Sequence, residues 1–300
     1  MLLALALGLA LAAEPARQVA ITIDDLPFVS ASPLPEDEVQ TRTKALLEHL
    51  RTRGVPATGF VNEGKFFEGE REDPAGAAHL ALWLDAGMEL GNHTYSHDDF
   101  NDTPLSVFQE DVLKGEVVTR RLMAARGTAP RFFRHPFLHT GREAPKKEAF
   151  EAFLAERGYR VAPVTIDNHD YLFARAYDLA AEPEKDRVME SYLRYMTAVI
   201  SYYEVQSRAI LGYELPQILL LHANSLNAAG LGRLLDMFTA RGYEFLSLEQ
   251  ALRDPAFSSS DTYLGPSGIT WLHRWAMARG VEKSVFAGEP EPSAFLPELQ

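Results

Sequence analysis

Short apolar segments alternate with amphipathic helical segments along most of the chain, and this alternation constrains the fold more than any other feature. Many of the apolar segments contain β-branched residues, and several end at polar residues. Strands that alternate with helices favour a parallel sheet that is buried on both faces. The predicted strands cover residues 18–23, 55–62, 88–92, 131–134, 159–166, 217–222 and 243–247. The predicted helices cover residues 36–53, 75–86, 105–126, 146–157, 183–211 and 230–241.

This order of elements predicts an α/β fold, a distorted (β/α) barrel of about seven parallel strands. We expect the main domain to span residues 18–250 and to contain a helical insertion, residues 172–216, in which no strand is predicted. The tyrosines of that insertion recur at three- and four-residue spacing, which favours packing on the barrel. Residues 251–300 form a C-terminal extension, with Trp271 and Trp275 on one helical face, and we expect it to wrap the barrel.

The chain contains no cysteine and carries a formal net charge of −13. The missing cysteines exclude disulfides, iron–sulfur clusters, thiolate zinc sites and a cysteine nucleophile. Any metal must therefore be held by histidine and carboxylate side chains. The negative charge repels phosphate backbones, so we expect no nucleic-acid partner.

The chain begins with an uncharged apolar segment, residues 1–13, that ends in small residues. Its apolar run is about 12 residues long, whereas a bilayer-spanning helix needs roughly 20. The segment is therefore predicted to be a signal peptide for export to the periplasm or the exterior, and we expect no transmembrane segment. The positive charge that usually opens a signal peptide is missing, so a late start codon or a buried N-terminal helix stays an alternative. The sequence does not indicate an oligomeric state.

Polar side chains lie at the ends of five predicted strands, either as the last residue or shortly after it. In a parallel α/β barrel the C-terminal ends of the strands meet at one edge, and active sites lie there. A single cavity at this edge would account for all of these residues together, whereas structural roles would need a separate reason for each. The residues are Asp24, Asp25, His93, His97, Arg134, Asp167, Asp170 and His222.

His93 and His97 are four residues apart, so on one helical turn both imidazoles would face the same ion. Such a pair is weak evidence alone, and a core role is the common alternative. The adjacent acids Asp24 and Asp25 would point to opposite faces of a strand, but at a strand-end turn both can face one cavity. One could then bind a metal while the other acts as a base. Two histidines, one carboxylate and water form the open coordination of a hydrolytic zinc site.

Five short motifs occur in one order along the chain. Together they resemble those of the polysaccharide deacetylases, carbohydrate esterase family 4, whose domain is also called the NodB-homology domain. The resemblance extends from about residue 18 to residue 250. The matching segments are TIDDL at 22–26, HTYSH at 93–97, RHPF at 134–137, DNHDY at 167–171 and LLH at 220–222.

The resemblance implies a metal-dependent mechanism. Asp25, His93 and His97 would bind the divalent metal, which we expect to be Zn²⁺. Asp24 would be the general base that takes a proton from water. Arg134 would keep Asp24 ionised and oriented through a charge-assisted contact.

The resemblance also implies how the substrate is held and released. The backbone N–H of Phe137 would stabilise the oxyanion. His222 would be the general acid that protonates the leaving amine, and Asp170 would raise its pKa. Tyr171 and Leu220 would form the pocket for the acetyl methyl group.

The chain departs from the family pattern at three places. Leu26 replaces the glycine that follows the aspartate pair, so the backbone there must follow another path. Tyr171 replaces a tryptophan, which changes the wall of the groove. The insertion at residues 172–216 is longer than usual, and we expect it to cover one end of the groove.

The sequence therefore favours a metal-dependent hydrolase that removes acetyl groups from an N- or O-acetylated polysaccharide of the chitin, peptidoglycan or xylan type. A hydrolase of another C–N bond, in a small or cyclic amide, is one alternative. A non-catalytic glycan-binding module on the same scaffold is a second alternative.

Overall fold

The structure, a computed structural model, describes residues 17–297. The predicted signal peptide, residues 1–13, lies outside the described residues. Within the described range, no helix combines the length and the apolar character needed to cross a membrane.

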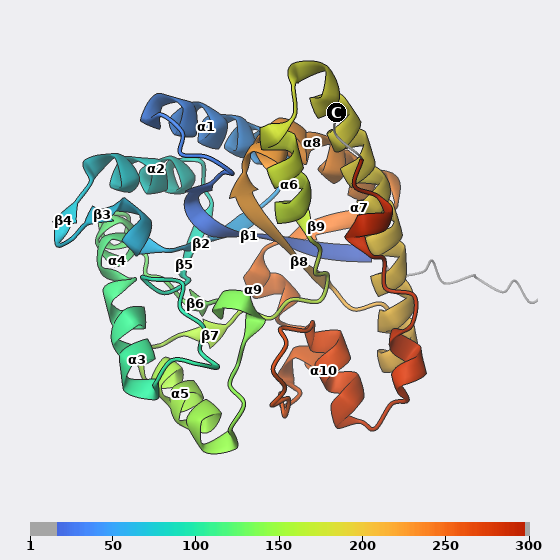
Figure 1. Ribbon diagram of the computed structural model, residues 1–300. Coiled ribbons are helices and arrows are strands. Elements are labelled where there is room, and N and C mark those ends of the chain that lie inside the picture. The colour runs from blue at the N-terminus through green and yellow to red at the C-terminus, as the bar shows by residue number, and fades with distance from the viewer. Residues whose placement is uncertain (1–16, 298–300) are drawn as a thin grey trace, which may run out of the picture.

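Seven parallel strands form one sheet that curls into a half-barrel, which confirms the predicted fold class (Figure 1). The strands are β1 Arg17–Val29, β2 Ala57–Val61, β5 Glu89–Asn92, β6 Phe132–Phe133, β7 Arg160–Val161, β8 Gln217–Asn224 and β9 Tyr243–Leu246. Their order is β7-β6-β5-β2-β1-β8, and β9 pairs with the first residues of β1. A separate antiparallel pair consists of β3 Phe67–Glu68 and β4 Arg71–Glu72.

Strand β1 is the centre of the sheet because it pairs with β8 along one edge and with β9 and β2 along the other. Its residues 19–24 are therefore fully buried, as the apolar run in the sequence indicates. Beyond β7, Ile166 forms a parallel bridge with Leu219 of β8, so this segment joins the two ends of the curled sheet. The C-terminal ends of these strands meet at one edge.

Ten α-helices in the described chain surround the sheet (Figure 1). They are α1 Glu36–Thr52, α2 Pro74–Asp85, α3 Leu105–Lys114, α4 Val117–Ala124, α5 Ala144–Glu156, α6 Asp170–Leu179, α7 Glu182–Leu211, α8 Ser225–Ala240, α9 Leu248–Ala251 and α10 Trp271–Ala278. Helix α6 was not predicted from the sequence. Helix α7 is the predicted long helix, and its four tyrosines at positions 192, 195, 202 and 203 are buried as expected.

The single helix predicted over residues 105–126 is wrong, because the chain breaks between α3 and α4. Gly115 packs against the loop after β5, where an added Cβ would lie 2.5 Å from the carbonyl carbon of Thr94. The buried carboxylate of Glu63 accepts hydrogen bonds from the N–H groups of Val118 and Thr119, which caps the new helix. The apolar periodicity continues through this break, so the pattern alone did not reveal it.

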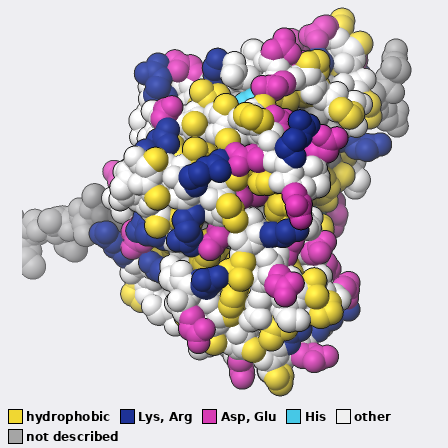
Figure 2. All heavy atoms as spheres, turned by 90° about the vertical axis from the view of Figure 1, so that its left-hand side faces the viewer, with side chains coloured by type: hydrophobic (Ala, Val, Ile, Leu, Met, Phe, Trp, Pro, Cys, Tyr) yellow, Lys and Arg dark blue, Asp and Glu magenta, His cyan; other side chains and the backbone are white. Residues whose placement is uncertain are grey.

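The face over β3, β4, α2 and α4 carries interspersed acidic and basic side chains (Figure 2). Cross-element ion pairs such as Arg121–Glu72 and Arg126–Asp85 contribute to this mixture. The net negative charge of the chain is therefore not gathered into one patch on this face.

The C-terminal extension packs onto the sheet through α10. Trp271 and Trp275 are both buried. The backbone N–H of Trp271 donates to the backbone carbonyl of Val164, 2.8 Å away. Val164 belongs to the segment that joins the two ends of the sheet. The extension therefore contacts the same core as the strands.

We expect Trp275→Ala to lower the free energy of unfolding by about 3–5 kcal/mol, because Trp275 is only 1% exposed and its removal leaves a cavity. Urea unfolding followed by circular dichroism measures this change. Met277→Ala, two residues along the same helix and 43% exposed, is the matched control and should change stability by less than about 1 kcal/mol. Equal small effects for both variants would contradict the packing of the extension.

Candidate active site

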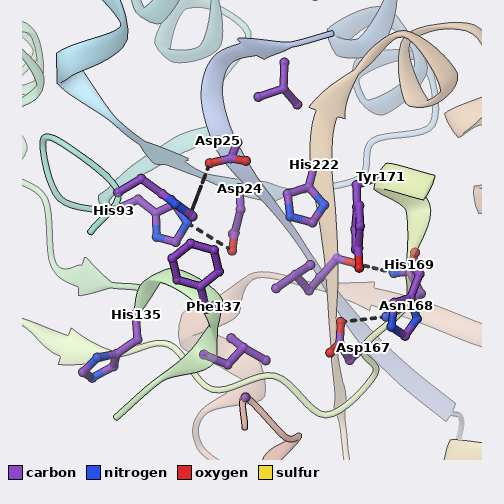
Figure 3. Close-up of a pocket in the computed structure, with 15 residues that line it drawn as sticks. Asp24, Asp25, His93, His135, Phe137, Asp167, Asn168, His169, Tyr171 and His222 are labelled. Carbon is purple, nitrogen blue, oxygen red and sulfur yellow. Dashed lines mark hydrogen bonds and ion pairs between the residues drawn. The ribbon is translucent and has the colours of Figure 1, made fainter. Parts of the chain in front are cut away.

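The two adjacent aspartates face one cavity because β1 becomes irregular where they lie. The regular register of β1 with β2 ends at Ile23, and Asp25 adopts a left-handed conformation with φ of 70°. This conformation breaks the alternation of side chains, so both carboxylates line the cavity (Figure 3). The side chain of Leu26 is then fully buried. Because the left-handed residue is Asp25 and not Leu26, the backbone at position 26 does not need a glycine. The leucine that stands there is buried in the core.

The two histidines lie on a loop after β5, so the helical turn predicted for them is wrong. Thr94 and His97 both have left-handed φ angles, 67° and 59°. The carboxylate of Asp111 accepts hydrogen bonds from the backbone N–H groups of Tyr95 and Ser96, which holds the loop in this shape. The two imidazole rings still meet, with centroids 4.9 Å apart.

Asp25, His93 and His97 form a cluster whose potential ligand atoms all lie within 4.8 Å of one another. The Oδ1 atom of Asp25 lies 3.6 Å from Nε2 of His97 and 4.0 Å from Nε2 of His93. The Nδ1 atom of His93 lies 2.8 Å from the carbonyl of Arg134, to which it donates a hydrogen bond, so the Nε2 lone pair points into the cluster. This donor set fits a divalent cation such as zinc.

Charges around the cluster favour the states that a metal requires. Burial alone would raise the pKa of Asp25, but Lys65, whose Nζ lies 3.2 Å from Oδ1, and the nearby histidines hold this pKa below its usual range. Burial lowers the pKa of His93 and of His97. The carboxylate is therefore ionised and the two imidazoles are neutral near pH 7.

Asp24 lies beside this cluster and has an unused hydrogen-bonding atom. Its Oδ2 lies 3.8 Å from both His93 Nε2 and Arg134 Nε, whereas its buried Oδ1 has no partner among the described residues. Burial raises the pKa of Asp24 to about 6, and Arg134 opposes this shift. Arg134 itself is fixed by donating to Thr22 Oγ1 at 2.7 Å.

On the other side of the cavity, His222 is paired with Asp170. Its Nδ1 lies 2.6 Å from Asp170 Oδ1, and the second carboxylate oxygen accepts hydrogen bonds from the side-chain amides of Asn224 and Asn227. Burial opposes the charged imidazolium, but the Asp170 carboxylate outweighs it and raises the pKa of His222 to about 10. His222 is therefore protonated near neutral pH.

These residues surround one cavity of about 550 Å³. Phe137 and Tyr171 form exposed aromatic walls, 54% and 50% exposed (Figure 3). Leu220 of β8 also lines the cavity. The structure thus brings every residue singled out for the site to one edge of the sheet. Asp170 and Arg134 lie behind the cavity wall, against His222 and Asp24 respectively.

Sequence reasoning missed Lys65 and Gly268. Lys65 follows a predicted strand as the other site residues do, so the strand-end rule could have found it. Gly268 belongs to the C-terminal extension, about 45 residues beyond the last motif, and lines the cavity beside Phe137. No local sequence pattern indicated this contact.

The fold and this edge of the sheet define the class: an α/β half-barrel of the kind found in family 4 carbohydrate esterases. A solved chitin deacetylase from Colletotrichum lindemuthianum has this fold, with a TM-score of 0.53 and 22% identity over 80% of this chain and 90% of that one. A family 4 pseudoenzyme from Bacillus anthracis has it too, with a TM-score of 0.52 and 17% identity over 79% of this chain and 66% of that one.

Sequence comparisons give the same family. Residues 12–152 match the family described as polysaccharide deacetylase. The chitin deacetylase of Colletotrichum lindemuthianum is 28% identical over 153 residues, 51% of this chain and 52% of that protein. A peptidoglycan-N-acetylglucosamine deacetylase of Bacillus cereus is 28% identical over 120 residues, 40% of this chain and 36% of that protein. Just under half of the chain therefore matches the polysaccharide deacetylase family, which it resembles, and its matches span about half or less of these relatives.

Proposed function

We propose that the protein is a metal-dependent hydrolase that removes acetyl groups from an N- or O-acetylated polysaccharide of the chitin, peptidoglycan or xylan type. The arrangement of Asp24, the Asp25–His93–His97 cluster and His222 around one cavity carries this proposal. Metal-assisted hydrolysis of an acyl group uses a cation, a base and an acid, and these residues could hold the cation and supply the other two. The pseudoenzyme among the similar structures shows that the fold alone does not imply activity, so the argument depends on these side chains.

Asp25, His93 and His97 would hold the cation, for which zinc fits a site of two imidazoles and one carboxylate. When bound, the ion supplies positive charge that makes water more acidic and polarises the acetyl carbonyl. The two neutral imidazoles and the ionised carboxylate can bind it without first losing protons.

The surrounding side chains move the protons. Asp24 accepts a proton from the attacking water, and the nearby guanidinium of Arg134 stabilises its ionised form. His222 donates a proton from Nε2 to the leaving nitrogen or oxygen, because its Nδ1 is already bonded to Asp170. The backbone N–H of Phe137 donates to the carbonyl oxygen as charge develops there.

The acetyl group would be held between the cavity walls. Tyr171 and Leu220 would enclose its methyl group, and the exposed ring of Phe137 would contact the sugar on the opposite side. The tyrosine at position 171 keeps an apolar wall next to His222, since the two ring centroids lie 6.1 Å apart.

Acetate release tests the proposal. The zinc-loaded protein is incubated with chitooligosaccharides, peptidoglycan fragments and acetylated xylan, and free acetate is measured over time. We expect release from at least one of the three. Inactivity on all three, with one equivalent of zinc bound, would contradict the proposal. Faster turnover of formamides or cyclic amides in the same screen would favour the alternative C–N bond hydrolase.

The pair of His222 and Asp170 predicts a specific pH dependence. A general acid works only while protonated, so activity falls as the pH rises through the pKa of His222, which Asp170 keeps high. In Asp170→Asn we expect the alkaline limb of kcat/KM to move to lower pH by about 1–3 units, because the charge that favours imidazolium is gone. A pH–rate profile measures this shift. An unmoved alkaline limb in a folded variant would remove His222 from the role of acid.

We also propose that the protein is exported. The apolar segment at residues 1–13 supports this, and the polymers proposed as substrates lie outside the cytoplasm. N-terminal sequencing of the protein recovered from the native host should find a mature chain that begins close to residue 14. Recovery of the intact N-terminus from the cytoplasm would contradict export.

A further inference from the structure

The Phe137–Leu138 turn has a backbone conformation that its own sequence does not favour. Phe137 and Leu138 have φ angles of 56° and 55°, in the left-handed region that large side chains rarely adopt. Two successive residues in this region persist only when the surrounding structure holds them.

The C-terminal extension lies directly against this turn. Gly268 packs so closely on it that an added Cβ would lie 1.8 Å from the carbonyl oxygen of Phe137 and 3.1 Å from Cβ of Leu138. Such a distance is far inside van der Waals contact, and the atom that it would meet is backbone. Only glycine fits at position 268 while the turn keeps its shape.

Arg274 joins the extension to the same turn by hydrogen bonds. This guanidinium is 1% exposed, and its Nη2 donates to the carbonyl of Leu138 at 2.5 Å. Its Nη1 donates to Thr140 Oγ1 at 2.8 Å and to Asp261 Oδ2 at 2.7 Å. The planar fork therefore links the turn, Thr140 two residues beyond it and the extension, which a lysine ammonium cannot do in the same way.

The Asp261 carboxylate completes a buried charge network. It lies 2.7 Å from Nζ of Lys147 in α5 as well as from Arg274. Arg274 also lies over the ring of Trp271, 4.0 Å from its centroid. Arg274 and Lys147 share the single carboxylate of Asp261, so this buried network favours one arrangement of the side chains beside the turn.

We infer that the C-terminal extension is a working part of the active site: Gly268 and Arg274 are positioning residues that hold the Phe137–Leu138 turn in its left-handed shape. The consequence for catalysis rests on the proposed function, in which the Phe137 N–H must point at the developing oxyanion. Arg274 does not line the cavity, and Gly268 lines it beside Phe137. Both act through the backbone of the turn.

Two independent variants test this inference, each with two readouts. In Arg274→Gln and in Gly268→Ala we expect faster hydrogen–deuterium exchange in peptides that contain residues 136–140. We also expect kcat for acetate release to fall about 10- to 100-fold, with less change in KM and with zinc content unchanged. Arg279→Gln is the matched control: Arg279 follows α10 and donates to the carbonyl of Ile210, away from the cavity. Its exchange at the turn and its kcat should equal those of the wild type.

The outcomes separate this inference from the proposed function. Unchanged exchange at the turn in both folded variants would overturn the positioning role, and so would faster exchange with an unchanged kcat. A wild-type protein without deacetylase activity would overturn the proposed function and the effect on kcat, but the exchange experiment would still decide whether the extension holds the turn. If Arg274→Gln does not fold, Gly268→Ala provides both readouts, since it removes no buried charge partner.

Discussion

Asp24→Asn should lower kcat/KM for acetate release about 10³-fold while the protein still binds its metal. Asparagine has nearly the same shape as aspartate but cannot accept the proton from water. Asp25, His93 and His97 are untouched by the change, so the cation site stays complete. Steady-state kinetics and metal analysis of the same preparation measure both parts of this result.

Asp167→Asn is the control for that experiment. Asp167 lines the same cavity, and burial raises its pKa to about 6, as it does for Asp24. It lies outside the cluster of potential ligands, so we expect its variant to keep activity within about tenfold of the wild type. Equal losses for the two variants would indicate a general need for cavity carboxylates and would remove Asp24 from the role of base.

Removing the metal should abolish activity without unfolding the protein. Chelation, or His97→Ala, should lower kcat/KM at least about 100-fold, since the cation contributes several kcal/mol to stabilising the transition state. The cluster lies at the edge of the sheet, with its two histidines on a loop and Asp25 near the end of β1, whereas the core is formed by the strands and the helices around them. The far-ultraviolet circular dichroism spectrum should therefore remain that of the wild type.

Readdition of zinc should restore activity to the chelated wild type but not to His97→Ala. His169→Ala is the matched control, because this histidine lines the cavity but is not in the cluster. Its metal content should equal that of the wild type. Full activity in protein shown to contain no metal would contradict the proposed chemistry.

Much of the fold could be predicted because it follows from local patterns. An apolar run such as residues 217–222 indicates a strand that is buried on both faces. Polar residues at the C-terminal ends of such parallel strands then lie at the same edge of the sheet. The same reasoning predicts that Asp24 and His222 line one cavity, and they do.

The rest could not be predicted because it depends on contacts between distant segments. Asp25 combines a left-handed conformation with a contact from its carboxylate to Lys65, forty positions along the chain. The break at Gly115 depends on the loop that packs against it. Gly268 contacts Phe137, which is more than one hundred positions away in the sequence. A local pattern of three or four residues cannot predict such a contact.

The left-handed backbone of the cavity has a consequence for engineering heat resistance. All five non-glycine residues that the described chain holds in this conformation lie at the site, in the last part of β1 or in the segments after β5 and β6: Asp25, Thr94, His97, Phe137 and Leu138. Each costs about 1 kcal/mol relative to glycine in the same conformation. A library selected only for thermal tolerance would therefore tend to enrich glycine at these positions and would lose the ligands and the turn. A library for thermal stability should therefore keep these five residues fixed and vary positions in the helices.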